Sequence, residues 1–302
     1  MSETTLTRLT ERVYWMSPGT PDRPSLAAVV GSEFTLMLDA GASAAHAAIF
    51  LEALERAGVR APRMIALTHW HWDHIFGAAR LGLPQIASSA TAAQIALLAG
   101  YDWDDAALDR RVASGDEIAF CADNIRIELP EPRSVQIILP EIVFETSLDI
   151  HTGGVTCQIR QVGGDHARDS CVIYMPEERV LFLGDCLYDD IYAPTRHYTR
   201  GRLFPLIERL LTFDAEFYIE GHNPDVLTRA QFEDRIAKMR TAGALTEQFG
   251  LAGASEVDVL MAAEAELGAP LDEDVEYYLK ALLAGRHAEP TGKRSRGESK
   301  HE

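Results

Sequence analysis

The segment from Thr68 to His74 reads Thr-His-Trp-His-Trp-Asp-His and places four side chains that can bind metal ions within six positions. These side chains are His69, His71, Asp73 and His74. Three imidazoles and a carboxylate so close together are costly to bury unless each finds a hydrogen bond or a cation. The cluster therefore indicates a metal site, the alternative being a surface turn that happens to be rich in histidine.

The position of the cluster in the chain favours metal binding. A short apolar run with strand character, residues 64–68, ends where the cluster begins. Open α/β sheets place their chemistry at the C-terminal ends of such strands. Residues two apart in an extended segment point to the same side, so His69 and His71 can bind one ion. Asp73 and His74, where the chain turns toward a helix opening at residues 75–80, face another direction and are available to a second ion.

Three more candidate ligands follow strand-like runs later in the chain. These are His166, Asp185 and His222, which come after residues 155–162, 180–184 and 217–220. A lone histidine after a strand is more often a hydrogen-bonded core or loop residue than a ligand. Three such residues behind the cluster are better explained together, as parts of one metal site.

This ordered set resembles the metallo-β-lactamase superfamily, whose five motifs are matched in order over about residues 10–225. Asp39 corresponds to the first motif, the cluster to the second, and the three later residues to the third, fourth and fifth. The resemblance implies an α/β fold, a four-layer αβ/βα sandwich with a C-terminal helical extension. The metals would lie at one edge, between the two sheets.

The resemblance also implies how the ligands are shared between two ions. One ion would be held by His69, His71 and His166. The other would be held by Asp73, His74 and His222, with Asp185 bridging the two. Asp39 would orient a ligand rather than bind metal itself.

Imidazoles and carboxylates suit zinc best, with iron or manganese as alternatives, so we expect two divalent ions. Asp73 and Asp185 supply two of the four negative charges that such a pair requires. A bridging hydroxide would help to complete the balance, because coordination lowers the pKa of water to about 7. That hydroxide is a suitable nucleophile for a carbonyl or phosphorus centre.

The candidate catalytic residues are Asp73 and Tyr188. Tyr188 lies three residues after Asp185. In some lactonase-type members of the superfamily, a tyrosine at this spacing points at the substrate carbonyl, which makes Tyr188 a candidate oxyanion donor. The alternative is ordinary packing where the strand ends.

Composition limits the choice of partners. The net charge of −18 argues against a nucleic-acid substrate, which would need a basic face, and favours a small neutral molecule. The chain has no apolar run long enough to span a membrane, and residues 1–5 lack the features of a signal peptide. Four cysteines without CxxC spacing are expected to be free thiols. We therefore expect a cytoplasmic enzyme that does not associate with membranes.

We expect a metallo-β-lactamase-like domain over residues 1–226, a helical extension over 227–288 and a disordered tail over 289–302. The early part of the domain is predicted to form strands at 13–16, 27–30 and 34–38 and a helix at 42–57. An insert at about 90–150 should contain helices at 90–98 and 104–112, then strands at 125–129 and 135–139. Helices at 228–249, 255–267 and 271–283 would support the substrate pocket or form a homodimer interface.

The insert could cover the site, with Tyr101 and Trp103 as pocket residues. The alternative is that Trp103 anchors the insert to the core, and the sequence favours this second interpretation.

The leading interpretation is a binuclear hydrolase of a small ester, lactone, thioester or lactam. A mononuclear-iron oxidoreductase of the persulfide dioxygenase type is the alternative, and β-lactam hydrolysis could be the main or a side activity. Glyoxalase II-type members bind glutathione carboxylates with basic residues in their C-terminal helices. Arg235, Lys238 and Arg240 lie in that region here, without a spacing that matches the role. A non-catalytic protein on the same scaffold is the interpretation least favoured.

Overall fold

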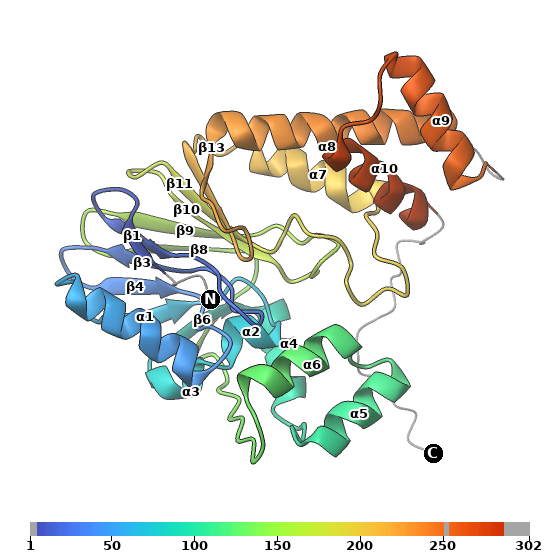
Figure 1. The fold of residues 1–302 in the computed structure, drawn as a ribbon. Helices are drawn as coiled ribbons and strands as arrows, with labels where there is room; N and C mark the ends of the chain where they lie inside the picture. Colours follow the sequence, from blue (N-terminus) through green and yellow to red (C-terminus); the bar gives the residue numbers. More distant parts are fainter. Residues whose placement is uncertain (1–4, 251–253, 287–302) are drawn as a thin grey trace.

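Two β-sheets lie face to face, with helices on both outer faces (Figure 1). The computed structural model describes residues 5–250 and 254–286, so the predicted tail over 289–302 lies outside the described residues. Helices α1 (Ala44–Arg56) and α3 (Ala78–Leu81) cover the first sheet, and α7 (Arg200–Leu210) and α8 (Arg229–Phe249) cover the second. The predicted four-layer α/β sandwich with C-terminal helices is confirmed.

The first sheet has seven strands, which lie in sequence order from β1 to β7. The first four pair antiparallel and the last three join in parallel. The strands predicted in the first forty residues are confirmed. The seven strands are β1 (Leu6–Arg8), β2 (Val13–Met16), β3 (Leu26–Val30), β4 (Thr35–Leu38), β5 (Pro62–Ala66), β6 (Gln85–Ser88) and β7 (Ile142–Phe144).

The second sheet has six strands in the order β13-β12-β11-β10-β9-β8. Its centre is apolar on both faces, because every residue of β10 and β11 is buried. This explains why their sequences show continuous apolar runs rather than alternation. The strands are β8 (Ser147–His151), β9 (Thr156–Gln161), β10 (Cys171–Met175), β11 (Val180–Gly184), β12 (Phe217–Glu220) and β13 (Leu227–Thr228).

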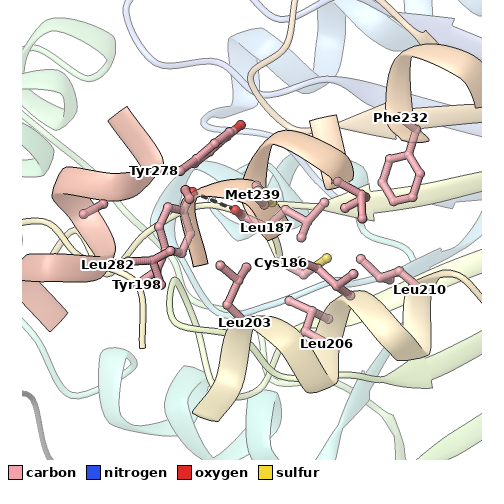
Figure 2. Packing of buried hydrophobic residues seen from close by; sticks show 14 of the residues in the cluster. Cys186, Leu187, Tyr198, Leu203, Leu206, Leu210, Phe232, Met239, Tyr278 and Leu282 are labelled. Atoms are coloured by element: carbon pink, nitrogen blue, oxygen red, sulfur yellow. Dashed lines mark hydrogen bonds between the residues drawn. The ribbon is translucent and has the colours of Figure 1, made fainter. Parts of the chain in front are cut away.

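Apolar side chains fill the three spaces between the layers. Leu36 and Val29 of the first sheet meet Phe182 and Ile173 of the second in the central space. A second cluster joins the first sheet to α1 and the insert. In the third, shown in Figure 2, α7 and α8 pack against the second sheet through residues that include Cys186, Leu206, Phe232 and Met239.

The predicted pair of helices in the insert is confirmed as α4 (Ser89–Leu98) and α5 (Asp105–Ser114). The strand predicted at 125–129 is wrong, because α6 (Ala119–Glu128) occupies that segment. The alternating apolar residues from Ile125 onward favoured a strand. However, Ile127 is 66% exposed, and the buried side chains follow helical spacing at Cys121, Ala122, Ile125 and Glu128.

The strand predicted at 135–139 is also wrong, because that segment is irregular. It contacts the sheet without extending it, through a hydrogen bond from Gln85 Nε2 to the Ile138 carbonyl (3.3 Å). The strand that pairs with β6 at this edge of the sheet is β7.

Trp103 anchors the insert to the core, as the sequence favoured. Its side chain is 7% exposed and meets Phe76 edge to face, with ring centroids 4.8 Å apart. Tyr101 lies beside Trp103, at 6.2 Å between ring centroids. Neither ring contact involves a residue of the predicted metal site.

A buried ion pair ties the insert to the N-terminal half of the chain. Glu128, at the end of α6, accepts hydrogen bonds from Arg23 Nε at 3.0 and 2.9 Å, and Arg23 Nη2 lies 2.9 Å away. The Ser43 hydroxyl also donates to Glu128. Ser43 in turn caps α1 by accepting from His46 N (3.0 Å). One carboxylate thus holds three separate segments together.

The C-terminal region is helical, as predicted. It consists of α8, α9 (Glu256–Leu267) and α10 (Glu273–Gly285), each beginning within two residues of its predicted start. Ser255 caps α9, as its capping pattern indicates. Helix α7 was not anticipated. Within the described residues no helix is long and apolar enough to cross a membrane, and all four cysteines are buried free thiols.

We expect Glu128→Ala to lower the free energy of unfolding by about 3 kcal/mol, because it removes one partner of a buried ion pair. Equilibrium urea denaturation measures the change. Asp109→Ala is the control, since its carboxylate pairs with Arg126 at the surface and is 74% exposed; such a pair contributes about 1 kcal/mol or less. Equal losses from the two variants would show that the buried pair has no special role.

Candidate metal centre

The seven predicted ligands lie together at the C-terminal ends of four strands. His69 and His71 follow β5, His166 follows β9, Asp185 follows β11 and His222 follows β12. Asp73 and His74 lie within a short helix, α2 (Trp72–Ile75). The helix therefore begins inside the cluster, three residues before the predicted position, and turns these two side chains away from the preceding extended segment.

The ligand atoms form two groups, within each of which they lie no more than 4.8 Å apart. One group contains His69, His71 and His166, and the other contains Asp73, His74, Asp185 and His222.

Asp185 faces both groups through a single oxygen. Its Oδ2 lies 3.3 Å from Nε2 of His166 and 3.9 Å from Nε2 of His69, in the first group. The same oxygen lies 3.4 Å from Nε2 of His74 and 3.3 Å from Nε2 of His222, in the second group. This carboxylate is thus the point at which the two groups meet.

The burial of these side chains fits a cation-binding site. His69 Nε2, His71 Nε2 and Asp185 Oδ1 are buried without a hydrogen-bond partner among the residues that the structure describes. Each such atom costs about 1–3 kcal/mol when nothing replaces its water. Divalent ions between the groups would satisfy the imidazole nitrogens together, and the donor set of nitrogens and carboxylate oxygens is one that such ions accept.

Contacts behind the ligands set the orientation of two rings. His74 Nδ1 donates a hydrogen bond to Asp39 Oδ2 (2.8 Å). The Thr68 hydroxyl donates to Asp39 Oδ2 (2.8 Å) and lies 3.0 Å from His69 Nδ1. Because the hydroxyl proton goes to Asp39, the His69 ring must donate to the hydroxyl oxygen. Both rings then direct Nε2 toward the site, where it can bind a metal ion once that nitrogen carries no proton.

The electrostatics differ between the two groups. Burial, reinforced by neighbouring imidazoles, holds the pKa values of His69 and His71 well below the usual range, so these rings are neutral. Burial also opposes the charge on His74, but the carboxylates of Asp73 and Asp185 outweigh it and raise the pKa of that ring. His69 and His71 can therefore bind a cation without losing a proton, whereas His74 must release one.

Asp22 is a residue near the site that the sequence did not indicate. Its Oδ1 lies 3.6 Å from His222 Nδ1, on the side of the ring opposite Asp73. Burial, followed by the charge on Asp73, raises the pKa of Asp22 to about 7. Asp22 belongs to an irregular segment before β3 that matches no motif, so only the folded chain brings it to His222.

Tyr188 lies beside the site. Its ring centroid is 5.9 Å from that of His166 and 6.2 Å from that of His222. The hydroxyl oxygen accepts a hydrogen bond from His222 N (3.2 Å), which leaves its own proton available to donate. Desolvation, with the nearby carboxylates of Glu220 and Asp185, raises the pKa of Tyr188 well above its usual value. The side chain therefore stays a neutral phenol.

The three basic residues considered for glutathione binding are each paired with acidic groups. Arg235 binds Glu220. Lys238 Nζ lies 2.8 Å from Asp274 Oδ2 and 3.3 Å from Asp272 Oδ1, and Arg240 Nη2 lies 2.6 Å from Glu208 Oε1.

Comparison with known proteins gives a consistent picture. The profile of the family described as the metallo-beta-lactamase superfamily matches residues 20–230. Metallo-beta-lactamase type 2 from Bacteroides fragilis is 33% identical over 72 residues, which is 24% of this chain and 28% of that protein. The matched segment thus spans less than a third of the curated relative.

Solved structures share the fold at low sequence identity. A metallo-beta-lactamase from Pontibacter korlensis is 18% identical with a TM-score of 0.54, over 78% of this chain and 98% of that chain. A stereoselective inverting sec-alkylsulfatase from Pseudomonas sp. is 16% identical with a TM-score of 0.63, over 96% of this chain and 51% of that chain. A metallo-beta-lactamase family protein from Thermus thermophilus is 17% identical with a TM-score of 0.59, over 93% and 95%.

We expect Gly221→Ala to lower zinc affinity at least about 10-fold, as loss of ligand support does elsewhere. A methyl group at Gly221 would come within 1.9 Å of Asp185 Oδ1 and 3.3 Å of His74 Cε1, so the carboxylate must move. Competition with a chromogenic chelator measures the affinity. Gly201→Ala is the control, because a methyl group there meets no atom within 4 Å. Unchanged zinc affinity in the Gly221 variant would contradict the importance of this close approach.

Proposed function

The chain belongs to the metallo-beta-lactamase superfamily, and on this premise we propose that it is a binuclear metal-dependent hydrolase of a small carbonyl substrate. The substrate would be an ester, lactone, thioester or lactam. The observation that carries the proposal is the position of Asp185, whose Oδ2 lies within 3.9 Å of Nε2 of four histidines drawn from both groups. A carboxylate in that position suits a bridge between two ions.

In this proposal His69, His71 and His166 hold one ion. Asp73, His74 and His222 hold the other, and Asp185 is shared. Zinc fits this donor set best, with iron or manganese as alternatives. Two such ions would supply Lewis acidity and an activated water molecule as the nucleophile.

Tyr188 is proposed to donate its hydroxyl proton to the carbonyl oxygen as negative charge develops there. The hydrogen bond from His222 N to the phenol oxygen fixes the hydroxyl and leaves its proton free for this purpose. Because its pKa is raised, the phenol is not lost to ionisation at neutral pH.

Asp73 is proposed as the second catalytic residue. Its Oδ2 lies 3.2 Å from His222 Nε2 and 3.3 Å from His74 Nε2, in the middle of the second group. From there its carboxylate can orient the attacking water and accept a proton from it.

The electrostatics favour a neutral substrate over a highly charged one. Ion pairs with acidic side chains already occupy Arg235, Lys238 and Arg240, which counts against a role for these residues in binding glutathione carboxylates. The net charge of −18 supports a small molecule rather than a nucleic acid as substrate.

Persulfide oxidation by a single iron ion and β-lactam hydrolysis remain the alternatives. The first would be recognised by one iron per chain and turnover of a persulfide, and the second by cleavage of a cephalosporin.

We expect the zinc-loaded protein to hydrolyse at least one member of a chromogenic panel of esters, lactones, thioesters and a cephalosporin. His69→Ala and Asp185→Ala should each reduce both metal affinity and turnover by about 100-fold or more, with the fold largely kept, since each removes a proposed ligand. Elemental analysis, initial rates and circular dichroism measure the three quantities. His151→Ala is the control, an exposed histidine on β8. Wild-type turnover by the Asp185 variant at full metal content would refute the bridging role.

We expect Tyr188→Phe to lower kcat by about 100-fold, because it removes one donor to the developing oxyanion. Metal content should not change. Steady-state kinetics on the best substrate of the panel test this. Tyr218→Phe serves for comparison, since its hydroxyl donates to the Ala215 carbonyl (3.3 Å) and its ring stacks on Phe232 in the apolar cluster between the second sheet and α8. An unchanged kcat would mean that Tyr188 is a packing residue.

A further inference from the structure

Two aromatic rings, Trp70 and Tyr192, stand beside the first group of ligands, and we call them the aromatic wall. The Trp70 ring meets the His71 ring nearly edge to face, at 4.6 Å between centroids and 80° between planes. The Tyr192 ring lies 5.6 Å from His71 and 5.9 Å from Trp70, tilted by 31° relative to the latter. Both wall residues are partly exposed, although His71 itself is buried. The wall therefore presents apolar surface next to the proposed reaction centre.

The Trp70 side of the wall is held by a buried carboxylate. Asp169 is 3% exposed, and the backbone N–H of Trp70 and the Thr91 side chain in α4 both help to stabilise the charge of its carboxylate. Asp169 lies in the loop between β9 and β10 that also carries His166. The position of Trp70 is thus coupled to the loop of a proposed ligand.

The Tyr192 side of the wall is held by two contacts. Its backbone N–H donates to Asp190 Oδ1 (3.0 Å), and its side chain lies close enough to Cys121 in α6 to affect the pKa of that thiol. The ring therefore lies next to the insert. Because the two rings already pack against His71 and against each other, a ligand that contacts them costs little side-chain entropy on binding.

The two sides of the site differ in chemistry. On one side stand the Tyr188 hydroxyl and His222, whose side chain is 29% exposed. On the other stands the aromatic wall. The rings of His71 and His166 lie between them, 4.6 Å apart. A carbonyl group whose oxygen faces Tyr188 can direct one of the two substituents on its carbon toward Trp70 and Tyr192.

We propose that the aromatic wall binds the apolar acyl group of the substrate, so that the site selects esters with a bulky alkyl or aryl group on the carbonyl carbon. This inference rests on the proposed hydrolase function, whose substrate class it narrows. Aromatic surface contributes to selectivity in proportion to the apolar area that it removes from water. An acetyl group is too small to cover either ring, whereas a hexanoyl or phenylacetyl group can contact both.

The test measures binding of the corresponding product carboxylates to the zinc-loaded, full-length protein by isothermal titration calorimetry. We expect hexanoate and phenylacetate to bind at least about 10-fold more tightly than acetate, since each methylene in an apolar site adds a severalfold factor. Trp70→Ala and Tyr192→Ala should each reduce this preference to about threefold or less. Acetate affinity and zinc content should not change, which would show that the metal site remains intact.

Two further variants separate the wall from other aromatic residues. Tyr192→Phe should keep the preference, because the ring rather than the hydroxyl meets the acyl group. Tyr101→Ala removes an aromatic ring of the insert that contacts Trp103 rather than the site, and it too should keep the preference.

The inference is overturned if wild-type protein binds none of the three carboxylates, binds them equally, or keeps its preference after Trp70→Ala and Tyr192→Ala. Rates with p-nitrophenyl acetate, hexanoate and phenylacetate distinguish this failure from failure of the proposed function. Turnover without acyl preference contradicts the role of the wall alone. A wall-dependent binding preference without turnover of any ester, lactone, thioester or lactam contradicts the hydrolase function while supporting the apolar subsite.

Discussion

The approach of one carboxylate to four buried imidazoles is the constraint on which the rest of the structure depends. Asp185 Oδ2 reaches both ligand groups only because β5, β9, β11 and β12 end at the same edge of the sandwich. The second sheet must therefore face the first closely enough for side chains from both to meet. The apolar layer between them, which includes Leu36 of the first sheet and Phe182 of the second, sets that separation.

The site also limits what its neighbours can be. Gly221 has no side chain because Asp185 occupies the space that a methyl group would need. Thr68 must supply a hydroxyl, since it connects Asp39 to His69 with one donated and one accepted hydrogen bond. Neither residue binds metal in our proposal, yet Gly221 leaves room for the Asp185 carboxylate and Thr68 decides which nitrogen of His69 faces the site. The specificity of the centre therefore depends on a second layer of contacts as much as on the ligands.

The segments outside the central sandwich meet at the loop that follows β11. Tyr277 of α10 donates to Asp189 (2.6 Å), and Tyr198 N donates to the Ala281 carbonyl (3.2 Å), so the C-terminal helices hold this loop from one side. Tyr198 also donates to the Leu187 carbonyl, as Figure 2 shows. On the other side, the Tyr192 side chain lies close to Cys121 of the insert. The insert and the extension thus act on the same loop, which carries both Tyr188 and one half of the aromatic wall.

Many of the candidate ligands and helix starts could be predicted, because short stretches of the sequence indicate them. The His-x-His-x-Asp-His cluster and the lone His or Asp after apolar runs indicate ligands at strand ends, and capping residues such as Ser255 mark where helices begin. Prediction from local patterns failed where contacts with residues far away in the chain decide which side chains of a segment are buried. Ile125 and Ile127 have the alternating spacing of a strand. However, they lie in α6, which buries Ile125 and exposes Ile127, because the ion pair of Glu128 with Arg23 fixes which face of the helix turns inward.

By itself the sequence determined which residues have ligand chemistry, the fold that they belong to and the order in which they come along the chain. Only the tertiary structure decided that Asp185 faces both groups, that Asp22 lies behind His222 and that Trp70 meets Tyr192. The physical reason is that these contacts join residues far apart in the chain. The distances between these side chains depend on how the two sheets pack against each other. Periodicity or spacing within a single segment cannot predict that packing.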